Sequence, residues 1–98
     1  MLFAEWRLVY TGAADGCANM AIDEATLVLV GEGRVPPTVR IYYWGAPCYT
    51  VGCLQSISVH SRDMLGEFEC VRRLTGGRAY LHGGDTSYSV HVYLADAL

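Results

Sequence analysis

The stretch that decides how this chain folds is residues 72–85, which read Arg72-Arg73-Leu74-Thr75-Gly76-Gly77-Arg78-Ala79-Tyr80-Leu81-His82-Gly83-Gly84-Asp85. Two adjacent glycines allow the backbone to turn sharply, and a ligand can approach the main chain closely because neither carries a Cβ. Arginines lie on both sides of the pair, and guanidinium groups bind carboxylates or phosphates through paired N–H donors. The stretch therefore indicates a loop that cradles a ligand.

The glycine pair also has a plainer interpretation, since Gly-Gly between two strand-like runs is the usual form of a hairpin turn. No Gly-Lys-Ser or Gly-Lys-Thr follows, so the segment is not a Walker phosphate loop. No Gly-x-Gly-x-x-Gly pattern opens a helix, as it does in dinucleotide-binding folds. The neighbouring sequence decides between a turn and a binding loop.

Four blocks, in the same order, resemble the lipoate-protein ligase A and octanoyltransferase family. Residues 72–90 resemble its signature, Arg-Arg-x-Thr/Ser-Gly-Gly-Gly/Arg-x-x-x-His followed by a strand near Thr-Tyr-Ser. Residues 19–24 resemble its first-helix motif, residues 37–44 its second strand and residues 51–55 the next. The Thr-Gly-Gly-Arg form resembles the octanoyltransferase branch. The resemblance spans residues 6–90 and favours a binding loop.

The resemblance implies an α+β fold, with a mixed sheet and flanking helices like those of class II aminoacyl-tRNA synthetases and biotin synthetases. Ninety-eight residues are enough for one small domain and not for two. We expect residues 1–98 to form the N-terminal portion of one biotin/lipoate ligase-type catalytic domain. Such a portion is incomplete, and its last strand is expected to present an unpaired edge.

The resemblance implies protein lipoylation, in which lipoate and ATP with Mg give lipoyl-adenylate and the lipoyl group is attached to a lysine of a lipoyl carrier domain. Such carriers belong to 2-oxoacid dehydrogenase complexes or are the glycine cleavage H protein. One alternative is octanoyl transfer from acyl carrier protein through a cysteine thioester. Another is a non-catalytic acyl-binding module or one half of a split enzyme.

The acyl or adenylate pocket is expected around the glycine loop. Arg73 matches the family position that contacts the nucleotide phosphate in ligases. Arg78 replaces a glycine common in ATP-using members, so it either pairs with a phosphate or obstructs that site and favours transfer. His82 is expected to orient its neighbours rather than act as a base. The predicted pocket residues are Arg73, Thr75, Gly76, Gly77, Arg78, Ala79, Tyr80, Leu81 and His82.

The motifs contain none of the groups that would perform the chemistry. The chain has no lysine, although the family uses one beyond the glycine loop to contact the acyl carboxyl and the adenylate phosphate. None of Cys17, Cys48, Cys53 and Cys70 matches the context of the family's nucleophile, and no Cys-x-x-Cys pair suggests zinc. We therefore predict no catalytic residue, no metal ligand and no activity for the chain alone.

Composition limits the partners. Hydrophobic residues make up 52% and charged ones 17%, below the roughly 25% of typical soluble domains, so we expect another surface to cover part of the chain. A formal charge of -3 argues against nucleic-acid binding, which needs a basic face. No apolar run approaches the roughly 20 residues of a membrane span, and no signal peptide is recognisable, so we expect a cytoplasmic protein.

The rest of the chain alternates strand-like and helical patterns. Apolar spacing predicts an amphipathic helix over residues 17–30, after a loop at residues 11–16. Residues 48–52 are expected to form a hairpin with the strand at residues 38–44. The other expected elements are strands at residues 6–10, 69–74, 79–82 and 86–94 and a short helix at residues 61–66.

Several polar side chains have both structural and functional interpretations. Asp23 and Glu24 point about 100° apart on a helix, so they form no carboxylate dyad, and a solvated face or a bond to a neighbouring strand is favoured. Asn19 either caps the helix or faces the pocket. Arg40 is a pocket wall or an outward-pointing strand residue, and the outward position is favoured.

The last strand alternates Tyr88 and Val90 with Ser89 and His91, as a sheet with one buried face requires. This pattern places His91, like His60, at the surface or on the side of a strand.

Overall fold

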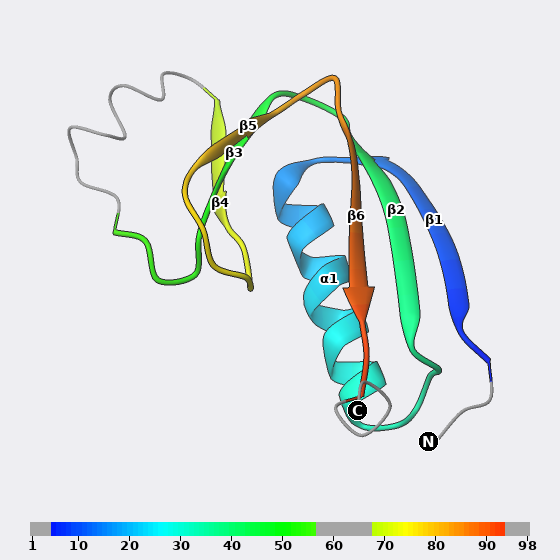
Figure 1. The fold of residues 1–98 in the computed structure, drawn as a ribbon. Helices are drawn as coiled ribbons and strands as arrows, with labels where there is room; N and C mark the ends of the chain where they lie inside the picture. Colours follow the sequence, from blue (N-terminus) through cyan, green and yellow to red (C-terminus); the bar gives the residue numbers. More distant parts are fainter. Residues whose placement is uncertain (1–4, 57–67, 94–98) are drawn as a thin grey trace.

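The computed structural model describes residues 5–56 and 68–93, which form an α+β fold (Figure 1). The described strands make two three-stranded sheets, ordered β1–β2–β6 and β4–β3–β5. In chain order the elements are β1 (Arg7–Ala14), α1 (Gly16–Gly31), β2 (Thr38–Trp44), β3 (Cys48–Val51), β4 (Glu69–Arg72), β5 (Tyr80–His82) and β6 (Thr86–His91). The expected fold class, a mixed sheet with helical cover, is confirmed.

Both sheets are mixed. β2 pairs in parallel with β1 and antiparallel with β6, and β3 pairs in parallel with β4 and antiparallel with β5. The predicted hairpin between residues 38–44 and 48–52 is therefore wrong, although both strands exist. The bend between them carries the chain from one sheet into the other, and the Gly45 N–H donates to the Ala14 carbonyl over 2.8 Å at the end of β1.

The glycine in β1 marks a bulge rather than a turn. β1 continues to Ala14 through residues that the sequence predicted as a loop. Its register with β2 shifts between Tyr10 and Gly12, and Gly12 has a φ of 71°, a conformation that favours glycine. The chain then enters α1, where the Asp15 carboxylate accepts the Ala18 N–H over 2.7 Å as the N-cap.

The helix predicted at residues 17–30 is confirmed as α1, but much of its apolar side is exposed. α1 lies beside β2 and β6 of one sheet and β4 of the other (Figure 1). Its buried residues are Gly16, Asn19, Thr26 and Val30. Its exposed residues include Ala18, Ala21, Ala25, Leu27 and Val28.

The β1–β2–β6 sheet also exposes apolar side chains. Tyr88 and Val90 of β6 are 73% and 52% exposed, while Ser89 points to the helix side. His91, expected at the surface, is buried, and Arg40 of β2, favoured as an outward residue, is completely buried. The alternation along β6 was read correctly, but the polar side of this strand is the one that packs against α1. Both expectations of exposure for these two residues were therefore wrong.

The apolar core of the described residues joins the two sheets. Tyr42 and Trp44 of β2 pack with Cys48 of β3, and Met20 of α1 and Val71 of β4 close the cluster. Among the described helical residues, none forms a segment long and apolar enough to cross a membrane. The expected helix at residues 61–66 lies outside the described residues.

Candidate functional site

A cavity of about 690 Å³ lies between the glycine loop, α1, β5 and β6. β6 contributes every residue of Thr86–His91 to its wall, and α1 contributes Met20, Asp23 and Leu27. The predicted pocket residues that line it are Arg73, Thr75, Arg78, Tyr80 and His82. The described lining does not include Gly76, Gly77, Ala79 or Leu81.

The glycine loop is held against the end of β3. The Cys53 N–H donates to the Thr75 carbonyl over 2.9 Å. Gly77 has a φ of 98°, in the left-handed region that favours glycine. A Cβ on Gly52 would collide with the Gly77 carbonyl, so the two segments approach this closely only because residue 52 has no side chain. Sequence reasoning placed Gly52 in a strand motif and missed this role.

Both arginines before the loop are occupied by carbonyl groups of the protein. Arg73 Nη2 donates to the carbonyls of Gly76 and Arg78, each over 2.9 Å. Arg72 Nη1 donates to the carbonyls of Gly52 and Gln55 over 2.9 and 2.6 Å. These bonds give Arg73 a structural task inside the loop, beside the phosphate contact that the sequence predicted for it.

His82 lies at the centre of a polar chain that borders the cavity. Its Nδ1 is 2.9 Å from Asp85 Oδ2, and its Nε2 is 2.9 Å from Thr50 Oγ1. Thr50 Oγ1 also accepts from Arg73 Nη1 over 2.7 Å. The ring stacks on Trp44, with centroids 4.1 Å apart. These contacts hold the ring on both nitrogens, and the orienting role expected for His82 stays a prediction.

Asp85 was not nominated from the sequence, although a carboxylate three residues after a histidine, in the short connection between β5 and β6, is a recognisable signal. It accepts the Gly83 N–H over 2.8 Å and the Ser87 hydroxyl over 3.2 Å, in addition to His82. Partial burial raises the pKa of the Asp85 carboxyl, but the hydrogen bonds from His82 and the backbone outweigh it and bring the pKa below its usual value. The carboxyl is therefore ionised at neutral pH.

Arg78 differs from Arg73. It lines the cavity, and within the described residues no hydrogen bond or ion pair uses its guanidinium group. Its backbone carbonyl is fixed by Arg73, so the loop is anchored while this side chain stays available. Of the two candidate anion contacts, Arg78 is the one whose side-chain donors have no partner among the described residues.

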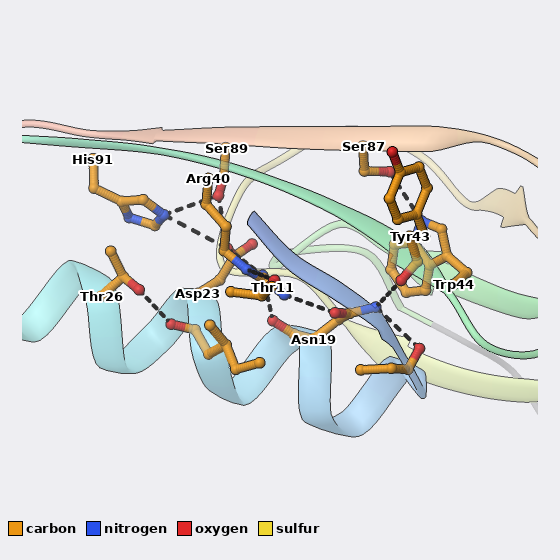
Figure 2. Close-up of polar contacts among 12 residues, drawn as sticks. Thr11, Asn19, Asp23, Thr26, Arg40, Tyr43, Trp44, Ser87, Ser89 and His91 are labelled. Carbon is orange, nitrogen blue, oxygen red and sulfur yellow. Dashed lines mark hydrogen bonds and ion pairs between the residues drawn. The ribbon is translucent and has the colours of Figure 1, made fainter. Parts of the chain in front are cut away.

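A second polar cluster lies beneath the sheet and reaches the cavity wall (Figure 2). Arg40 Nη1 donates to Asp23 Oδ1 over 2.8 Å, and the Ser89 hydroxyl donates to the same oxygen over 2.7 Å. His91 Nε2 lies 3.0 Å from Ser89 Oγ and 3.5 Å from Asp23 Oδ1. The favoured bond between Asp23 and a neighbouring strand is confirmed, and this carboxylate joins α1 to both β2 and β6.

Asn19 fills neither of its two expected roles. The N-cap is Asp15, and Asn19 is absent from the described cavity lining. Its amide donates to the carbonyls of Ala14 and Tyr43 over 3.2 and 3.0 Å, and its oxygen accepts from Arg40 Nη2 (Figure 2). Asn19 is completely buried and connects the start of α1 to the sheet.

The cysteines show no sign of activation. Burial and the carboxylate of Glu69 raise the pKa of Cys48 to about 12. Glu69, ahead of a smaller effect of burial, raises the pKa of Cys17. All four cysteines are free thiols, and no cluster of three or more metal-ligating side chains occurs in the part of the chain that the structure describes.

Comparison with known proteins shows one family match that includes both the glycine loop and most of the fold. Residues 15–97 match the lipoyl protein ligase A/B catalytic domain. Similar relatives are the octanoyltransferases LipM of Moorella thermoacetica, 45% identical over 92 residues, and of Brevibacillus brevis, 44% identical over 92 residues. The matches cover 87% and 90% of this chain, and 32% and 33% of the relatives.

The octanoyltransferase LipM of Kyrpidia tusciae is also similar, with 41% identity over 91 residues, 89% of this chain and 33% of the relative. The chain thus spans about a third of the length of the curated relatives it matches. The family match takes in α1, the glycine loop and β6, which together form the cavity wall. This chain belongs to the lipoyl protein ligase A/B catalytic domain family, whose members are lipoate-protein ligases and octanoyltransferases.

Proposed function

We propose that this chain is the N-terminal portion of an octanoyltransferase catalytic domain, which moves an octanoyl group from acyl carrier protein to a lysine of a lipoyl carrier domain. Its 41–45% identity to octanoyltransferases LipM supports this choice within the family. The observation that carries the proposal is the cavity bordered by the loop Thr75-Gly76-Gly77-Arg78.

The cavity has the chemistry that an acyl chain needs. Its wall carries the apolar side chains of Met20, Leu27 and Val90, and polar groups gather at the loop. An acyl slot requires an apolar wall together with a few donors beside the carbonyl. Arg78 lies at the end of the loop, and its guanidinium donors, which have no partner within residues 5–56 and 68–93, suit the phosphate of a phosphopantetheine arm.

The proposed reaction has two steps. A cysteine thiolate attacks the octanoyl thioester of the carrier, which releases the carrier thiol and forms an enzyme thioester. The amine of the target lysine then attacks that thioester, forms the amide and releases the cysteine thiol. The lysine belongs to the carrier domain, and we do not assign the thiolate to Cys48, which is 1% exposed with a pKa of about 12. The residues described here bind and orient the acyl group.

The lipoate ligase alternative has weaker support. It needs ATP with Mg and a cation for the adenylate phosphate, yet Arg73 already donates to Thr50 and to two carbonyls of the loop. Arg78 is then the remaining cation of the loop. The target carriers we propose are lipoyl domains of 2-oxoacid dehydrogenase complexes or the glycine cleavage H protein, and the location we propose is cytoplasmic.

Calorimetric titration of the purified chain tests the proposal. The ligands are a thioether analogue of octanoyl-phosphopantetheine and a non-hydrolysable lipoyl-adenylate analogue. Tighter binding of the first supports the transferase, and tighter binding of the second favours the ligase. Arg78→Ala should weaken the phosphopantetheine ligand about tenfold, as loss of a charge-assisted contact does. Arg34→Ala, which removes an exposed arginine paired with Glu32, is the matched control. No saturable binding by a chain with intact circular dichroism would refute the proposal.

A further inference from the structure

Hydrogen bonds around His82 run in one direction, from Arg73 to Asp85. A guanidinium group can only donate, so the contact between Arg73 Nη1 and Thr50 Oγ1 makes the threonine oxygen an acceptor. An ionised carboxylate can only accept, so His82 Nδ1 donates to Asp85. In the neutral ring, Nε2 then carries no hydrogen and accepts the Thr50 hydroxyl. We call the chain Arg73–Thr50–His82–Asp85 the relay, and each of its polar groups has one consistent role.

We propose that Asp85 and Thr50 are positioning residues, which act through His82 and Arg73 to hold the glycine loop in the shape that receives the octanoyl donor. The inference rests on the proposed function. Arg73 is the link, because the same guanidinium that bonds Thr50 also donates to two carbonyls of the loop. The orientation of one buried hydroxyl group is thereby coupled to the shape of a loop at the cavity.

Neighbouring side chains fix the relay from both sides. Thr50 is completely buried, and His82 is stacked on Trp44. Trp44 Nε1 donates to Ser87 Oγ over 2.9 Å, and Ser87 in turn donates to Asp85 (Figure 2 shows the Trp44–Ser87 bond). Thr50 is shielded from solvent. If its hydroxyl lost the hydrogen bond to the histidine nitrogen, no water could therefore accept that hydrogen instead. An unmet buried donor is costly.

Asp85→Asn isolates this effect, because an amide has nearly the shape of a carboxylate. The amide N–H would donate to His82 Nδ1 and move the ring hydrogen to Nε2. In serine proteases the same kind of substitution leaves the geometry intact and gives the histidine the wrong tautomer. Here the new Nε2–H would point at Thr50 and displace the buried hydroxyl hydrogen from its acceptor. We expect binding of the octanoyl ligand to weaken about tenfold.

Nitrogen-15 NMR of the purified chain reads the tautomer of His82 directly, and amide hydrogen exchange reads the loop at Gly76 and Gly77. The unmodified chain should show a protonated Nδ1. Asp85→Asn should show a protonated Nε2, faster exchange in the loop, unchanged exchange in β1 and β2, and weaker binding of the octanoyl-phosphopantetheine analogue. A protonated Nε2 in the unmodified chain would overturn the inference, and so would a switched tautomer with unchanged loop exchange.

A second pair of variants keeps the test decisive if Asp85→Asn fails to fold. Thr50→Val keeps the shape of the side chain and removes the hydroxyl, whereas Thr50→Ser keeps the hydroxyl. Loop exchange and binding should change in the first and be retained in the second; equal behaviour of the two would contradict the relay. If the variants change hydrogen exchange in the loop but the unmodified chain does not bind the octanoyl ligand, the proposed function is refuted and the relay stands. If the unmodified chain binds the ligand but the variants change neither loop exchange nor affinity, the relay is refuted and the proposed function stands.

Discussion

The two faces of the β1–β2–β6 sheet differ from those of most sheets, because half of the covered face is polar and the open face carries large apolar side chains. The face against α1 carries Arg40, Ser89 and His91, and the other face carries exposed Tyr10 and Tyr88. A sheet with one covered face usually buries its apolar side chains there. Here charge-assisted hydrogen bonds attach the helix to the Arg40 half of the covered face, and Tyr42 and Trp44 make the other half apolar. Exposed apolar surface of this kind is typical of surfaces that contact another molecule.

The comparison predicts the largest loss of stability on the inner face. Arg40→Ala leaves Asp23 and Asn19 without the cation that they hold in a buried site, so the free energy of unfolding should fall by about 3–5 kcal/mol. Urea denaturation followed by circular dichroism measures it. Arg34→Ala removes an exposed ion pair with Glu32 and should cost less than about 1 kcal/mol. Equal midpoints for the two variants would show that the inner cluster contributes little.

Asn19→Ala should have the next largest effect. The change removes two amide donors to the carbonyls of Ala14 and Tyr43 and an acceptor for Arg40, so we expect a loss of about 1–3 kcal/mol in the same assay. Glu24→Ala, at an exposed position of the same helix, is the matched control and should stay within about 0.5 kcal/mol. A reversed order would mean that the buried amide does not connect α1 to the sheet.

Alkaline pH should weaken the inner face through Tyr42. Burial, followed by the carboxylate of Asp23, raises the pKa of Tyr42 from 10.0 to about 12. A tyrosine with a raised pKa in the folded state contributes stability that is complete below pH 10 and is lost as the pH rises from 10 towards 12. Between pH 10 and 12, the slope of the unfolding free energy against pH should correspond to about one proton fewer released in Tyr42→Phe than in the unmodified chain. Identical slopes of the unfolding free energy against pH in the two proteins would show that the Tyr42 hydroxyl is in contact with solvent.

Substitutions on the exposed outer face of the sheet should change the free energy of unfolding least. Tyr88→Thr replaces a residue that is 73% exposed by one suited to strands, so the free energy of unfolding should change by about 0.5 kcal/mol or less. Light scattering of concentrated samples should decrease, since an exposed apolar side chain has been removed. A loss approaching that of Asn19→Ala would show that this face is already covered in solution.

Local pattern predicted the elements because helix and strand periodicity are properties of neighbouring residues. The helix at residues 17–30 and the strand at residues 38–44 are present almost as expected. Strand partners were not predictable in the same way, because β2 pairs with β6 across more than forty residues. The faces were misjudged because an apolar stripe shows that burial is favoured, and does not show which surface provides it.

Of the pocket residues predicted from the motif, Arg73, Thr75, Arg78, Tyr80 and His82 line the cavity, and their role in binding stays a prediction. The motif could not show how the arginine donors are used, because their partners are backbone carbonyls with no residue signature. Thr50 was not predicted for a related reason: it lies in β3, more than twenty residues before Arg73, with which it forms a hydrogen bond. Asp85 was within reach of sequence reasoning, because its spacing from His82 is local.

The stack between Trp44 and His82 has an optical consequence. Trp44 is 6% exposed and lies against an imidazole ring, whereas Trp6 is 49% exposed, so the two indoles should emit at different wavelengths. The shorter-wavelength emission belongs to the indole that touches the loop network, and a change in the tautomer or tilt of the ring alters its quenching. The protein therefore contains its own fluorescent reporter of the glycine loop, and no label is needed to follow ligand binding in real time.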